Sequence, residues 1–155
     1  MTHSRRQFLT SGSTVTLLTL MAASGLLGRE AAAGQWHKAA FESKNIQDLV
    51  RTLGGSAPQR SDDIVFVGPE IAENGAVVPI EIASQLPGTD SIALLIEKNP
   101  NLLAANFAIP AGTLPEIQTR VKMAETCNVY ALVRAQGKFY YTAKEIKVTV
   151  GGCGG

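Results

Sequence analysis

Short runs of branched apolar residues, separated by turn residues, fill most of the chain and restrict its fold more than any other feature. Several runs alternate apolar and polar residues with the period of two that is typical of β-strands. The runs cover residues 64–67, 77–83, 92–97, 102–109, 117–123, 129–134, 139–142 and 145–150. The turn residues between them are Asn74-Gly75, Pro87-Gly88, Asn99-Pro100, Pro110-Ala111-Gly112 and Gln136-Gly137. About eight short strands at such regular spacing predict a mainly β chain, folded as an immunoglobulin-like antiparallel β-sandwich, with a small barrel as the alternative.

One helix is expected before the strands. Apolar residues recur at helical spacing among charged residues over 38–53, and Gly54-Gly55 follows as a stop signal. We therefore expect a short amphipathic N-terminal helix.

The first 33 residues have the layout of an export signal. The pair Arg5-Arg6 is followed by Gln7-Phe8-Leu9, an uncharged and mostly apolar run over 15–27, and three alanines at 31–33. Consecutive arginines indicate the twin-arginine route. Because the apolar run is shorter than the ~20 residues that a spanning helix needs, we expect no stable membrane anchoring. The sequence thus predicts a signal peptide over 1–33 and a periplasmic protein.

The remaining chain is divided into one domain and a short tail. Residues 34–150 have the length of a single domain and would form the helix and the β-sandwich. Lys and Arg number 14 against 13 Asp and Glu, and several of the basic residues fall in the signal. Since no basic excess is left, nucleic acid is excluded as a partner.

The tail over 151–155 is a cysteine between two pairs of glycines. It reads Gly151-Gly152-Cys153-Gly154-Gly155, and glycine is the residue that costs the most entropy to order, so we expect a flexible arm. At ~3.3 to 3.6 Å per extended residue, the Cys153 thiol can reach about 10 Å beyond the last strand residue. No cation or base near Cys153 in the sequence would activate the thiol. Cys153 is therefore predicted to be a covalent attachment point that other enzymes load, and the protein a non-catalytic carrier.

The other candidate groups are few. Cys127 begins a strand-like run, which suggests a small buried side chain, although an even cysteine count in an exported chain leaves a Cys127–Cys153 disulfide open. The two histidines, His3 and His37, supply neither a protease triad nor a multi-histidine metal site. We expect no catalytic residue, no metal and no cofactor.

At these residues the sequence resembles the SoxY family, the carrier subunit of the bacterial thiosulfate-oxidising system. The pentapeptide Gly151–Gly155 is the most diagnostic part. The other matching segments are 144–150, 120–126, Asn99-Pro100 and 104–107, and with the twin-arginine leader the resemblance spans nearly the whole chain.

The resemblance implies partners and chemistry that the residues alone do not show. It implies a heterodimer with SoxZ that is exported as a complex. It also implies that the SoxXA c-type cytochrome joins thiosulfate to Cys153 as an S-thiosulfonate and that the SoxB dimanganese hydrolase then releases sulfate. Where the system includes it, the SoxCD sulfane dehydrogenase would oxidise the remaining sulfur. These cofactors would belong to the partners.

Two other classes of function compete with the carrier. A structural or adhesive sandwich module could use its terminal cysteine to crosslink subunits, and it would form a reducible homodimer. A thiol oxidoreductase is disfavoured because the sequence has no Cys-x-x-Cys pair.

Overall fold

The computed structural model describes residues 38–151 of the chain. The predictions for the signal peptide, with Arg5 and Arg6, and for the tail residues Gly152, Cys153, Gly154 and Gly155 lie outside the described residues.

The expected single helix is two short helices, α3 (Lys38–Phe41) and α4 (Ile46–Thr52). The break lies at Asn45, which has an extended backbone and whose side-chain oxygen accepts a 2.8 Å hydrogen bond from Asp48 N. Asparagine is favoured at such N-cap positions because its side chain satisfies an amide that the helix leaves free. The C-terminal end of the helix was predicted correctly, since Leu53 is the C-cap of α4 and Gly54 has a φ of 80°. No helix in the described part of the chain is long and apolar enough to cross a membrane.

The strands follow the predicted runs closely. Their bounds are β1 (Gln59–Arg60), β2 (Ile64–Val67), β3 (Ile71–Ala72), β4 (Val78–Ser84), β5 (Thr89–Ile96), β6 (Leu103–Ala108), β7 (Glu116–Val121), β8 (Cys127–Ala135) and β9 (Lys138–Val148). Two differences from the prediction stand out. The runs 139–142 and 145–150 are joined in one continuous strand, β9, which ends at Val148, two residues before the end of the second run, and the two-residue strands β1 and β3 were not predicted.

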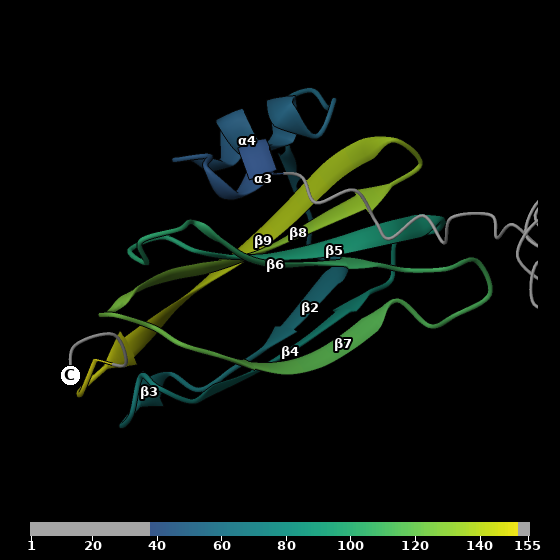
Figure 1. The fold of residues 1–155 in the computed structure, drawn as a ribbon. Coiled ribbons are helices and arrows are strands. Elements are labelled where there is room, and N and C mark those ends of the chain that lie inside the picture. Colours follow the sequence, from purple (N-terminus) through teal and green to yellow (C-terminus); the bar gives the residue numbers. More distant parts are fainter. Residues whose placement is uncertain (1–37, 152–155) are drawn as a thin grey trace, which may run out of the picture. The chain divides into compact units, whose positions relative to one another are not determined.

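The strands form two sheets. The larger has the order β1-β9-β8-β5-β6 with β3 also paired to β9, and the smaller has the order β2-β4-β7. All pairs are antiparallel except those of β1 and β3 with β9. The small sheet lies on one face of the large sheet and the two helices lie on the other (Figure 1). The predicted mainly β, immunoglobulin-like sandwich is confirmed.

The large sheet is buried on both faces, and β5 shows this most clearly. Ile92, Leu94 and Ile96 belong to the core between the two sheets. Ala93 and Leu95 belong to a second core, which the helices cover. Because successive side chains of a strand point to opposite faces, this double burial explains why the run over 92–96 is apolar without alternation.

Candidate functional site: the base of the cysteine segment

The predicted attachment residue, Cys153, lies two positions beyond Gly151, the last residue that the structure describes. The structure therefore shows the base from which this segment leaves the sandwich. That base consists of the end of β9, the turn between β3 and β4, and the connection between β7 and β8.

The end of β9 is held on both edges. On the side of β8, Val148 N donates a 2.9 Å hydrogen bond to Thr126 Oγ1. On the side of β3, Thr149 N donates to Ala72 O at 3.1 Å, and Thr149 Oγ1 donates to Glu73 O at 2.8 Å. Since both edges are bonded, the direction of the strand is fixed up to its last residues.

The turn between β3 and β4 forms a further hydrogen bond to the chain just after β9. Gly75 N donates to Val150 O at 2.7 Å, and Gly75 O accepts a 2.7 Å hydrogen bond from Met123 N. Met123 is fully buried in the core between the sheets. Gly75 thus connects the end of β9 to a segment whose side chain is anchored inside the protein.

Position 151 leaves no room for a side chain. A Cβ atom at this position would overlap the carbonyl oxygen of Ala124. The neighbouring backbone cannot yield easily, because the side chain of Asn99 donates to Lys122 O at 2.7 Å and accepts from Ala124 N at 3.0 Å. Glycine at position 151 therefore has a steric reason, which is independent of any need for flexibility.

The other cysteine is part of the core. Cys127 begins β8 and is only 4% exposed, among the residues between the two sheets. It is a free thiol, and burial raises its pKa, with smaller opposing contributions from backbone hydrogen bonds at Lys98 and Glu97. The prediction of a small buried side chain is confirmed. A bridge from Cys127 to Cys153 would require the core to open.

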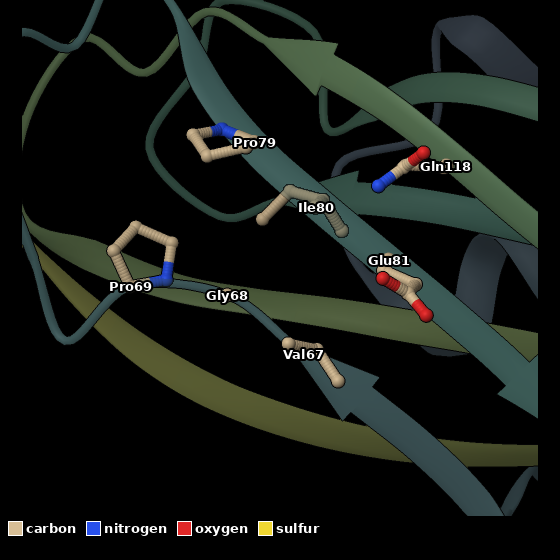
Figure 2. A pocket seen from close by; sticks show the side chains of 7 residues that line it. All are labelled: Val67, Gly68, Pro69, Pro79, Ile80, Glu81 and Gln118. Atoms are coloured by element: carbon tan, nitrogen blue, oxygen red, sulfur yellow. The ribbon is translucent and has the colours of Figure 1, made fainter.

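A shallow pocket of about 210 Å³ lies on the outer surface of the small sheet (Figure 2). It is lined by Val67, Gly68, Pro69, Pro79, Ile80, Glu81 and Gln118. Glu81 and Gln118 supply one carboxylate and one amide, and the rest of the lining is apolar or backbone. Within residues 38–151, no three His, Cys, Asp or Glu side chains gather in a way that could hold a metal ion.

Sequence reasoning predicted an attachment segment but missed the residues of its base. Gly75 was noted only as a turn residue, Asn99 as a turn residue and part of a matching segment, and Ala124 only as part of a matching segment. Their roles depend on contacts between positions far apart in the sequence, so no local pattern could have revealed them.

The fold and the base together define a class of protein: an immunoglobulin-like sandwich whose final strand is held by hydrogen bonds on both edges up to its end. The particular family comes from comparison. The family model described as "Sulfur oxidation protein SoxY" matches residues 49–153, which is more than half of the chain. The chain belongs to the SoxY family.

Solved structures agree with this assignment. The sulfur carrier protein SoxY from Chlorobium limicola f thiosulfatophilum is 38% identical, with a TM-score of 0.60 over 66% of this chain and 94% of that chain. A superoxide reductase (neelaredoxin) from Ignicoccus hospitalis is 18% identical, with a TM-score of 0.49 over 55% of this chain and 79% of that one, too weak a likeness to support any inference. No curated protein sequence matches the chain significantly. Family membership gives the protein a carrier role in sulfur oxidation.

Proposed function

We propose that the protein carries thiosulfate-derived intermediates of sulfur oxidation covalently on Cys153. The observation that carries this proposal is the family match, which extends to residue 153 and so reaches the cysteine. The structure supports it in two ways. The base is held in place up to Gly151, and the thiol of Cys127 is buried and so unavailable to a partner.

The proposed chemistry needs only a thiol from this chain. Loading would form a bond between Cys153 Sγ and the terminal sulfur of thiosulfate, release the thiol proton and pass two electrons to a c-type cytochrome. Hydrolysis of the resulting S-thiosulfonate would take up water and release sulfate, leaving a persulfide on Cys153. The glycines at 151, 152, 154 and 155 would let the cysteine enter partner active sites, because they add no side chains that could block a narrow channel.

The partners and the location are part of the same proposal. The protein would form a heterodimer with SoxZ and would serve SoxXA, SoxB and, where present, SoxCD in turn without catalysing a step itself. It would act in the periplasm after export by the twin-arginine route, which moves folded proteins.

Mass spectrometry of the intact protein and of its tail peptide tests the proposal. Protein recovered from cells supplied with thiosulfate should carry sulfur adducts on Cys153, and mild reductant should remove part of them. Cys153→Ala should abolish the adducts.

Cys127→Ala is the matched control, because it also removes one thiol but at a buried position. It should leave loading unchanged. Adducts on the Cys153→Ala protein, or only free thiol and disulfide-linked dimer in the wild type under every condition, would refute the carrier function.

A further inference from the structure

Three large apolar side chains are exposed around the base of the cysteine segment. Ile71 is 57% exposed, Val77 is 55% exposed and Val150 is 64% exposed. Ile71 belongs to β3, Val77 precedes β4, and Val150 follows β9. We call these three residues the apolar collar.

Hydrogen bonds hold the segments of the collar together at one end of the sandwich. Gly75, in the turn between Ile71 and Val77, donates to Val150 O at 2.7 Å. Thr149 N donates to Ala72 O at 3.1 Å, which joins β3 to the same end of β9. The ends of β3 and β9 lie side by side (Figure 1).

The position of Cys153 in the chain brings any reaction partner to this end. Cys153 is three residues beyond Val150, so even a fully extended chain places its Cα no more than about 11 Å from that of Val150. An enzyme that encloses the thiol in its active site must therefore cover the surface around Val150. That surface carries the collar.

The side chains on this surface indicate which kind of side chain a partner would place against them. Exposed apolar residues surrounded by polar ones are typical of the centre and rim of protein interfaces. Around the collar lie charges of both signs, such as the exposed Glu73 and Lys147 and the ion pair of Lys98 with Glu125 at 3.4 Å. Because these four charges balance, we take apolar contact rather than charge attraction as the means by which a partner would bind here.

We propose that the apolar collar is the common docking surface for the enzymes that act on Cys153, each of which meets it with an apolar rim around its active-site entrance. This inference rests on the proposed carrier function. It specifies the surface of the carrier that the enzymes recognise, and it specifies that they recognise this surface through apolar contact.

The test compares enzymatic with non-enzymatic modification of the same thiol. The collar variant is Ile71→Ser with Val77→Ser, which shortens exposed side chains and leaves the backbone hydrogen bonds in place. The matched control is Leu114→Ser, at a residue that is 81% exposed beyond the other end of β7. Each protein is loaded with thiosulfate by the SoxXA cytochrome, and separately alkylated with iodoacetamide.

We expect kcat/KM for cytochrome-dependent loading to fall roughly tenfold or more in the collar variant, mainly through KM, because two apolar contacts of the interface are lost. Alkylation of Cys153 should keep the wild-type rate, and Leu114→Ser should resemble the wild type in both assays. Val150→Ser, which changes only the third collar residue, should lower kcat/KM in the same direction.

Two results would overturn the docking proposal while the carrier function stands. The first is a kcat/KM for loading in the collar variants that equals that of the wild type. The second is an equal slowing of loading and alkylation, which would mean that the collar changes the exposure of the thiol rather than binding of the enzyme. If the wild type itself accepts no sulfur adduct, the carrier function fails and the docking proposal fails with it.

Discussion

Replacement of Gly151 by alanine probes how tightly the base of the cysteine segment is packed. The added Cβ would overlap the carbonyl oxygen of Ala124, a residue whose backbone amide donates a hydrogen bond to the side chain of Asn99. We expect the chain to relieve the overlap by moving Gly151 away from Ala124, because Gly151 lies beyond the hydrogen bonds that hold residues 148–150, whereas Ala124 is tied to Asn99 through its amide. This movement stretches the 2.7 Å hydrogen bond from Gly75 N to Val150 O.

The magnitude decides which measurement can detect the change. A backbone hydrogen bond contributes about 0.5 to 1.5 kcal/mol net to stability. A glycine-to-alanine change also stabilises a protein by about 0.4 to 1 kcal/mol through the unfolded chain. The two contributions nearly cancel in the free energy of global unfolding, so a thermal melt would show little.

Amide hydrogen exchange separates the local effect from the global one. Loss of about 0.5 to 1.5 kcal/mol at the Gly75 hydrogen bond should speed exchange of the Gly75 amide roughly 2- to 10-fold. The amide of Ile109, which donates to Asp90 O at 2.9 Å in another part of the protein, should keep its rate. Val150→Ala is the matched control, because it changes an exposed side chain beside Gly151 and leaves the backbone in place. An unchanged Gly75 rate in Gly151→Ala would refute the close approach.

Three further predictions concern the core, the base and the leader. Burial raises the pKa of the Cys127 thiol, so the unfolded chain ionises at this residue at lower pH than the folded protein does. The contribution of the neutral, buried thiol to stability is therefore fully present below the ordinary cysteine pKa of about 8.5 and is lost as pH rises above it. Urea unfolding at pH 8 and pH 10 should therefore show a larger loss of stability for the wild type than for Cys127→Ala, and equal losses would contradict this reasoning. Asn99→Ala removes the two hydrogen bonds that Asn99 makes to the connection between β7 and β8. It should lower the free energy of unfolding, measured by urea titration, by about 1 to 3 kcal/mol. An unfolding midpoint equal to that of the wild type would mean that these two bonds do not stabilise the base. Replacing both Arg5 and Arg6 by lysine should keep the protein in the cytoplasmic fraction if export follows the twin-arginine route, and normal periplasmic recovery would exclude that route.

The strands could be read from the sequence because their signals are local. Alternation and turn residues placed β2 at its observed bounds and β4 within one residue of them. The prediction divided β9 in two because Ala143 and Lys144 interrupt the pattern of branched residues. In the structure β9 continues through them, since β8 pairs along one edge and Lys144 Nζ reaches Gly68 O at 2.6 Å on the other.

The sequence by itself determined the class of fold, the family resemblance and the glycine-rich segment with its cysteine, because these depend on residue types in short continuous stretches. The tertiary structure alone decided the base of that segment. The contact between Gly151 and Ala124, the bridge from Asn99 and the hydrogen bond from Gly75 to Val150 join positions that are far apart in the chain. Such contacts exist only after the two sheets have packed, and that packing is set by the whole core rather than by any local pattern.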